Sequence, residues 1–344
     1  MTPRGAHGAL KTGWSATTGD YAIAGAWGHR GSVLVVADVS GGVFGFESTS
    51  GAVRWQRVAS HEGNLLAMAM HPSGKTIATS GQDGKVVVCS VDDGRVLRVI
   101  ELGNGWVEHV AWSPDGQLLA ASKSRQVYVY DLDGTEVWQS DPHPSTVSAI
   151  AWAGPHELAT ACYGRVSFFD TSSGELSQKL QWKGSLVSMV LSPSGEVVAC
   201  GSQDNSVHFW RRSTGEDAMM QGYAGKPSQL AFDEAGLLLA TGGGESVTVW
   251  SFQGDGPEGS RPGVLSLHVK PITALAFANR GRRLASGGRD GGVVVWSLQG
   301  SGDGGPIGAA MVGDVIAELL WRPDDHALAC LDASGGVTVW RLRR

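Results

Sequence analysis

The chain repeats one short β-rich phrase eight times, at spacings of about forty residues. Each copy is a β-rich run of the form Val-x-Val/Phe-aromatic, and the copies begin at Val43, Val86, Val127, Val166, Val207, Val247, Val293 and Val337. A fixed period of this length indicates that one supersecondary unit recurs. Such a unit cannot bury its hydrophobic face alone, so the fold must pack neighbouring units against each other.

Each repeat predicts a four-stranded antiparallel sheet. In the block from Ile272 to Met311, an apolar strand, a turn, a second strand, a tight turn and the strand Val293–Leu298 precede a weaker fourth strand. Gly, Pro, Asn and Asp separate the strands. The turn after the first strand recurs as Pro-Ser-Gly or Pro-Asp-Gly, because Pro pre-sets the turn and Gly supplies a positive φ. We expect the Gly-rich segments 253–263 and 299–308 to be loops between third and fourth strands.

Composition excludes several classes of protein. With 17% charged and 42% hydrophobic residues, the 344-residue chain is too apolar to be disordered and too polar to be a membrane protein. Its net charge of −6 argues against nucleic acid as the main partner. Residues 1–20 lack the pattern of a signal peptide, and the four cysteines form no C-x-x-C pair. We therefore expect a cytoplasmic protein with reduced cysteines and no membrane attachment.

The phrase, the period and the recurring turn together resemble the WD40-repeat β-propeller family, in a bacterial-type, single-domain form. The resemblance covers nearly the whole chain and implies an all-β propeller of four-stranded antiparallel blades. In this family a His before the first strand, a Ser or Thr in the second strand, an Asp in the next turn and a Trp in the third strand form one network. All four positions are matched by His268, Ser286, Asp290 and Trp296. Three are matched by His61, Thr79 and Asp83, with Cys89 where Trp is expected.

The eight phrases predict eight blades within one domain. The successive blades are expected at 17–58, 61–101, 104–141, 144–181, 184–222, 225–267, 270–311 and 312–344. The last block ends with its third strand, so residues 8–16 are expected to pair beside Val337–Leu342 and close the ring. A seven-bladed ring with one degenerate block is the alternative, because seven blades are commoner in the family.

The resemblance also implies where a partner binds, namely on the loops before each first strand and after each second strand. Aromatic residues and Arg dominate binding hot spots, so we expect anchors there. The expected anchors are Tyr21, Trp106, Tyr163, Trp182, Tyr223 and Arg289. A basic rim that favours an acidic partner is expected from Lys123, Arg125, Arg165, Lys183 and Lys226. For Trp182 and Tyr223, which stand at the network's His position, packing between blades is the alternative.

Nothing in the chain predicts catalysis. His268, Ser286 and Asp290 could be mistaken for a catalytic triad, but their spacing matches the structural network. The ten His residues are not expected to converge on a metal, and no cofactor is predicted. We interpret the chain as a non-catalytic protein–protein interaction scaffold, with a monomer favoured. The alternative is a metal-handling or small-ligand propeller that uses its central channel or its His-bearing loops.

Overall fold

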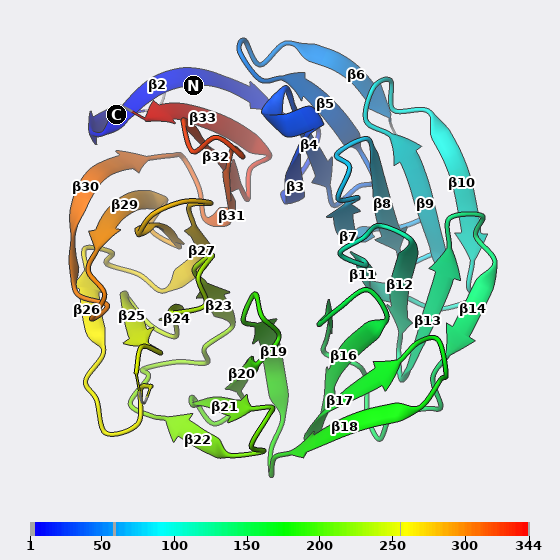
Figure 1. Cartoon of the computed structure of the whole chain (residues 1–344). Coiled ribbons are helices and arrows are strands. Elements are labelled where there is room, and N and C mark those ends of the chain that lie inside the picture. The colour runs from blue at the N-terminus through cyan, green and yellow to red at the C-terminus, as the bar shows by residue number, and fades with distance from the viewer. Residues whose placement is uncertain (1–3, 58–59, 255, 343–344) are drawn as a thin grey trace. The chain divides into compact units, whose positions relative to one another are not determined.

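The computed structural model describes residues 4–57, 60–254 and 256–342 (Figure 1). The described chain is all-β, with one short 3-10 helix, η1 (His29–Gly31). Its strands form eight antiparallel sheets, one for each repeat, so the expected β-propeller class with eight four-stranded blades is confirmed. By their contacts the residues form two compact units, Thr18–Met189 and Val190–Arg344 with Met1–Thr17. The described residues include no helix long and apolar enough to cross a membrane.

The unit Thr18–Met189 holds the first four blades, each running from the first to the fourth strand in chain order. Blade 1 consists of β3 (Ala22–Gly28), β4 (Val33–Asp38), β5 (Val43–Glu47) and β6 (Val53–Arg57). Blade 2 consists of β7 (Leu65–Met70), β8 (Thr76–Gly81), β9 (Lys85–Ser90) and β10 (Val96–Glu101). Blade 3 consists of β11 (Val107–Trp112), β12 (Leu118–Lys123), β13 (Gln126–Asp131) and β14 (Glu136–Gln139). Blade 4 consists of β15 (Ala149–Trp152), β16 (Glu157–Cys162), β17 (Arg165–Asp170) and β18 (Leu176–Gln181).

The other unit begins within the first strand of blade 5. Blade 5 consists of β19 (Leu186–Leu191), β20 (Val197–Ser202), β21 (Val207–Arg211) and β22 (Asp217–Met220). Blade 6 consists of β23 (Gln229–Phe232), β24 (Leu238–Gly242), β25 (Ser246–Ser251) and β26 (Gly263–Ser266). Blade 7 consists of β27 (Ile272–Phe277), β28 (Arg283–Gly288), β29 (Gly292–Leu298) and β30 (Gly304–Met311). Blade 8 consists of β31 (Ile316–Trp321), β32 (Ala327–Asp332), β33 (Gly336–Leu342) and the N-terminal strand β2 (Leu10–Thr17).

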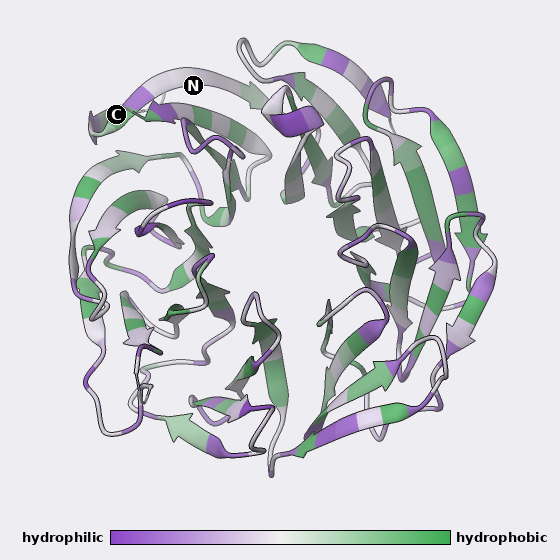
Figure 2. Ribbon diagram, viewed as in Figure 1, coloured by the Kyte–Doolittle hydropathy of each residue, from purple (hydrophilic) through white to green (hydrophobic). Residues whose placement is uncertain are grey.

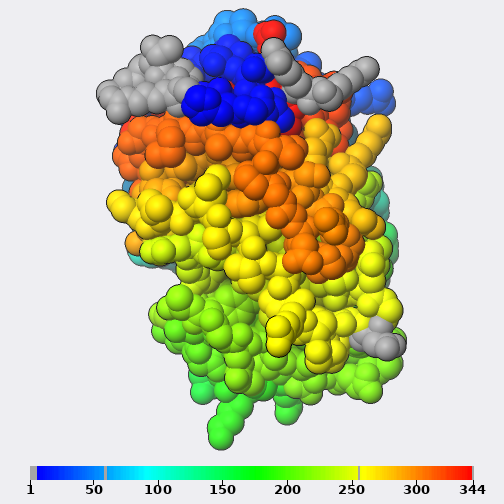
Figure 3. All heavy atoms as spheres, turned by 90° about the vertical axis from the view of Figure 1, so that its left-hand side faces the viewer, coloured from blue at the N-terminus to red at the C-terminus, as the bar shows by residue number. Residues whose placement is uncertain are grey.

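The N-terminal segment completes the last blade, as expected. β2 pairs antiparallel with β33 from Leu10 opposite Leu342 to Thr17 opposite Gly336 (Figure 1). A strand that the sequence did not predict, β1 (Arg4–Gly8), pairs with β30 and gives blade 7 a fifth strand. Figure 3 shows these N-terminal residues in blue along the orange segment that includes β30. The N-terminal segment therefore covers the outer edges of two consecutive blades.

The repeated phrase is the third strand of every blade, and the second and third strands form the core. In blade 1 the strand β4 is buried at every residue, and its Val35 packs in one cluster with Ile77 and Val87 of blade 2. Burying one such side chain stabilises the fold by about 1.5–3 kcal/mol. Figure 2 shows the same pattern, with hydrophobic residues on the strands and hydrophilic ones on the connecting loops.

The recurring turn has the backbone that its sequence predicts. Gly74, Gly116 and Gly195 all adopt a φ near +70°, at +69°, +74° and +72°. In the looser copy, Asp325 takes this position with a φ of 59°. Its carboxylate accepts hydrogen bonds from both the backbone and the side-chain nitrogen of Asn279, each at 2.8 Å. The expectation of a loop throughout 299–308 is wrong, because β30 begins at Gly304.

Candidate functional site

Blade 7 contains the complete four-residue network. Nδ1 of His268 lies 3.2 Å from the Asp290 carboxylate, and its Nε2 lies 2.9 Å from the Ser286 hydroxyl. The Trp296 indole N–H donates to the same hydroxyl at 2.8 Å. Because a carboxylate only accepts, Nδ1 carries the proton and Ser286 donates to Nε2. Burial alone would raise the pKa of Asp290, but hydrogen bonds from two backbone N–H groups and His268 outweigh it and lower that pKa.

Blade 2 forms the same network without the indole. The imidazole of His61 lies 3.0 Å from both the Asp83 carboxylate and the Thr79 hydroxyl. Burial again opposes ionisation of Asp83, yet hydrogen bonds from His61 and from the backbone lower the pKa of this carboxyl. Both sets of contacts fit the structural role that the sequence analysis assigned to these residues.

Blade 4 forms a variant of the network in which one hydrogen-bond acceptor belongs to blade 3. Nε2 of His143 lies 2.9 Å from the Thr160 hydroxyl, as in the other blades. Its Nδ1 lies 3.0 Å from the backbone carbonyl of Arg125, in the turn between β12 and β13. Burial lowers the pKa of His143, and the nearby Arg165 and Arg125 guanidiniums lower it further. The imidazole is therefore neutral, and the carbonyl replaces the Asp that this blade lacks.

Blade 6 forms a second variant, in which Tyr223 replaces the His. The Trp250 indole N–H donates to the Tyr223 hydroxyl at 2.9 Å, and that hydroxyl lies 2.8 Å from the Thr241 hydroxyl. Thr241 in turn donates to the Thr248 carbonyl at 3.1 Å. Burial raises the pKa of Tyr223. These contacts fit the alternative in which Tyr223 packs within the framework of the blade.

The buried network does not offer a nucleophile. Ser286 has no exposed surface, and its hydroxyl is bonded to both His268 and Trp296. A substrate cannot reach this oxygen without opening the blade. Within the ranges that the structure describes, no group of three or more His, Cys, Asp or Glu side chains could hold a metal ion.

The candidate surface is a row of loops in the unit Thr18–Met189. Each loop before a first strand bonds to the turn after the second strand of the preceding blade. The four bonds, from backbone N–H to backbone carbonyl, are Ser60 to Gly41 (3.0 Å), Leu102 to Gly84 (2.8 Å), His143 to Arg125 (2.7 Å) and Trp182 to Gly164 (3.0 Å). These bonds make the loops a continuous face, which we call the loop face.

Exposed aromatic side chains occur on the loop face alone among the described residues. The chain has 13 Trp, 5 Tyr and 8 Phe, and nearly all of them are buried or half-buried. The exposed ones are Trp106 (55%), Tyr163 (59%) and Tyr21 (39%), all three predicted from the sequence as anchors. Trp182, predicted with them, is half-buried.

Four of the predicted cations lie on the same face without carboxylate partners. Lys123, Arg125, Arg165 and Lys183 make no ion pair with any residue that the structure describes. Lys123 donates to the Leu102 carbonyl, and Arg125 Nε donates to the His143 carbonyl at 2.6 Å. The acids nearby are Glu108, which accepts from the Ser124 N–H at 3.0 Å, and the exposed Asp141. The remaining predicted residues, Lys226 and Arg289, are exposed in the other unit.

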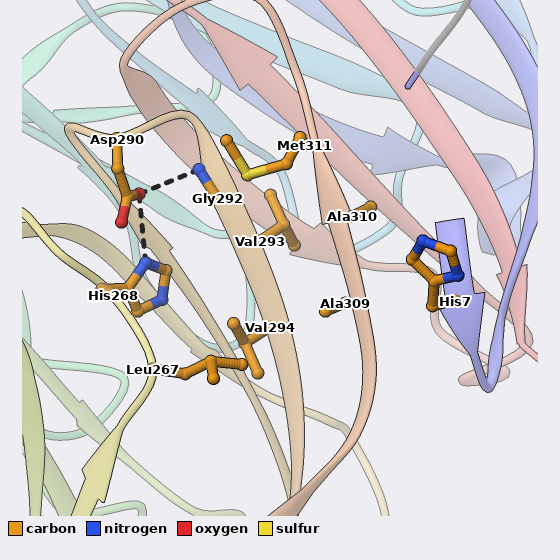
Figure 4. A pocket seen from close by; sticks show the side chains of 10 residues that line it. All are labelled: His7, Leu267, His268, Asp290, Gly292, Val293, Val294, Ala309, Ala310 and Met311. Atoms are coloured by element: carbon orange, nitrogen blue, oxygen red, sulfur yellow. Dashed lines mark hydrogen bonds and ion pairs between the residues drawn. The ribbon is translucent and has the colours of Figure 1, made fainter. Parts of the chain in front are cut away.

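Two pockets lie beside the His positions of blades 7 and 4, and the sequence indicated neither. One, of about 360 Å³, is lined mainly by apolar atoms of Leu267, β29 and β30, beside His268 and Asp290. Figure 4 shows His7 of β1 across β30 from Val293 and Val294 of this pocket. The other, of about 350 Å³, lies between β14 of blade 3 and β17 of blade 4 and includes His143 and Arg165.

Sequence comparison identifies the repeats. The family model described as "WD domain, G-beta repeat" matches residues 55–90, 174–211 and 259–297. The model of the anaphase-promoting complex subunit 4 WD40 domain matches residues 110–191. The chain belongs to the WD40-repeat β-propeller family. Each matched WD40 repeat begins at or near the fourth strand of one blade and ends in or at the third strand of the next.

Curated WD40 relatives are distant and mostly longer. Telomerase protein component 1 of Rattus norvegicus is 22% identical over 297 residues, which are 82% of this chain and 11% of that protein. WD repeat-containing protein 1 of Gallus gallus is 21% identical over 335 residues, which are 83% of this chain and 55% of that protein. Autophagy-related protein 16 of Arabidopsis thaliana is 21% identical over 87% of this chain and 51% of that protein. The chain thus spans about half or less of these relatives' length.

A solved structure supports the same fold. The crystal structure of the computationally designed Ika8 protein matches with a TM-score of 0.83 and 20% identity. The match covers 96% of this chain and 100% of the designed one. At this identity the likeness bears on the WD40 propeller fold alone.

Proposed function

We propose that this WD40 propeller is a non-catalytic docking platform whose loop face binds a protein or peptide partner. The observation that carries the proposal is the position of the exposed aromatic side chains. Trp106, Tyr163 and Tyr21 all lie on the loop face, although most aromatic residues of the chain are buried. Exposed aromatic side chains are costly in water and are enriched at the centres of protein interfaces.

The charge of the loop face favours an acidic partner. The whole chain is acidic, at −6, yet Lys123, Arg125, Arg165 and Lys183 lie on this face without ion pairs among the described residues. Unpaired cations raise the association rate of an oppositely charged partner and set its orientation. WD40 repeats generally serve as scaffolds for protein interactions, and the buried Ser286 agrees with a role without catalysis.

The cellular setting belongs to the same proposal. All four cysteines are free and buried, and burial raises the pKa of the Cys89 thiol to about 11. Unpaired cysteines of this kind are typical of a reducing compartment. We propose a cytoplasmic location and a monomeric state.

The test compares partner capture by the wild type, by Trp106→Ala with Tyr163→Ala, and by Val269→Ala as control. Val269 is 72% exposed but lies in the other unit. The double variant should lose proteins that the wild type captures from its native host, while the control keeps them. Equal capture by all three would contradict the proposal. Stoichiometric zinc in the purified protein would favour the metal-handling alternative.

A further inference from the structure

The pocket between blades 3 and 4 has an apolar end and a cationic end. We call it the Arg165 groove. Arg165, Ser167 and Phe169 alternate along β17, so their side chains share the face that lines the groove. The opposite wall is β14, whose Trp138 ring centre lies 5.1 Å from that of Phe169. Leu176, half exposed, extends the apolar end.

At the cationic end, Arg165 has no ion-pair partner among the described residues. Nε of Arg165 is buried without a hydrogen-bond partner among the described residues, and the guanidinium makes no ion pair with any of them. His143 beside it is neutral, since burial and the two guanidiniums lower its pKa. The carboxylate that lines the groove, Asp141, makes no ion pair with Arg165. A half-buried guanidinium without an ion pair gains charge-assisted hydrogen bonds when a carboxylate arrives.

The corresponding pocket of blade 7 provides an internal comparison. It lies beside His268, as the Arg165 groove lies beside His143, and both positions precede the first strand. When β29 and β17 are aligned on Trp296 and Phe169, Gly292 of blade 7 corresponds to Arg165 of blade 4. Val294 corresponds to Ser167 in the same alignment. The blade 7 pocket also holds the Asp290 carboxylate. The two pockets share a place in the repeat, and each has one Asp, but of the two only the pocket in blade 4 is lined by an Arg, which can bind an anion.

We propose that the Arg165 groove binds an extended peptide segment of the protein partner, one that places an acidic residue on Arg165 and an apolar residue against Trp138 and Phe169. This inference rests on the proposed function and adds the chemistry of the partner. The volume of about 350 Å³ is near the lower end of ligand sites, which span about 300–1,000 Å³. It accommodates one or two side chains rather than a folded domain.

The strand β17 also sets the spacing of the two residues in the peptide. Arg165 and Phe169 are four residues apart, which corresponds to about 13 Å at about 3.3 Å per residue. An extended peptide covers the same length in the same number of residues. The acidic and apolar residues should therefore lie about four positions apart.

The experiment selects random 12-residue peptides displayed on phage against the full-length protein and measures the enriched peptides by fluorescence anisotropy. Arg165→Ser should weaken binding at least tenfold, whereas Asp141→Asn should strengthen it, because it removes the acid that lines the groove. Lys270→Ser is the control, since it also removes one positive charge but at an exposed residue of the other unit. Circular dichroism and thermal melting verify that each variant is folded.

Several outcomes would overturn the proposal. These are an absence of enriched peptides, enriched peptides without the acidic and apolar pair, equal binding to Arg165→Ser, or weaker binding to Asp141→Asn. If Arg165→Ser fails to fold, Asp141→Asn still tests the proposal, because stronger peptide binding supports it and weaker binding contradicts it. Peptides whose binding depends on Trp106 and Tyr163 but not on Arg165 would contradict the Arg165 groove as the binding site. They would still support docking on the loop face. Peptides that depend on Arg165 but not on Trp106 and Tyr163 would support the groove and count against the aromatic anchors of the loop face.

Discussion

Replacing Tyr223 by Phe removes one oxygen from the framework of blade 6 and nothing else. The Trp250 indole N–H loses its acceptor at 2.9 Å, and Thr241 loses its bond to Tyr223 at 2.8 Å but keeps the one to the Thr248 carbonyl. Leaving one buried donor unsatisfied costs about 1–3 kcal/mol, and we expect the free energy of unfolding to fall by that amount. For a chain of this length the melting temperature should fall by about 1–4 °C.

The matched control is Tyr163→Phe, which removes a hydroxyl from an exposed side chain. Tyr163 is 59% exposed, so water replaces any bond of its hydroxyl and the stability should stay within about 0.5 kcal/mol. Urea unfolding of both variants gives the free energies. The Trp250 indole proton should also shift upfield in a spectrum of protein labelled with ¹⁵N-tryptophan. Equal stability of the two variants, or an unmoved indole signal, would refute the assigned role of Tyr223.

Two further predictions concern the blades of the same unit. Deleting residues 1–16 removes most of β2, exposes the edge of β33 and should lower the melting temperature far more than either Tyr variant; unchanged melting would show that β2 is dispensable. Because the folded state lowers the pKa of Asp290, the ionised carboxylate adds to the free energy of unfolding. This stabilisation is complete above the unfolded pKa of about 3.9 and is lost as pH falls through the folded pKa. Urea unfolding at pH 5 and pH 3 should therefore show a smaller loss of stability for Asp290→Asn than for the wild type, and equal losses would contradict this.

The sequence predicted the parts of the fold whose signal is local or periodic. The third strands, the blade count and the pairing of β2 with β33 followed from the period and from the missing strand of the last block. The network of His268 was predictable because all four residues lie within one repeat. The exposure of Trp106 and Tyr163 followed from their position in loops, and their role as anchors stays a prediction.

Features that join different repeats, or lack a β pattern, were not predictable. His143 bonds to a backbone carbonyl in the preceding blade, and any residue type could supply that carbonyl. In blade 6, Tyr223 donates a hydrogen bond to Thr241, whereas in blade 7 the hydroxyl of Ser286 donates to His268. A search for the His pattern does not reveal this reversal. The segment Arg4–Gly8 has no apolar alternation, so β1 had no signal. The Arg165 groove depends on the approach of β14 to β17, which belong to neighbouring blades.

The pairing of β2 with β33 has a consequence for how the protein is made. Ser15 and Thr338, which face each other in this pair, are separated by 323 positions along the chain. A ribosome that adds about 5–20 residues per second needs about 15–60 s to synthesise that length. During this time the nascent strand has no partner, and Leu10 and Trp14, buried in the finished protein, stay in contact with water. A polypeptide released before β33 is complete would keep the unpaired, apolar edge of β2 exposed. Premature termination should therefore yield aggregates or substrates for chaperones.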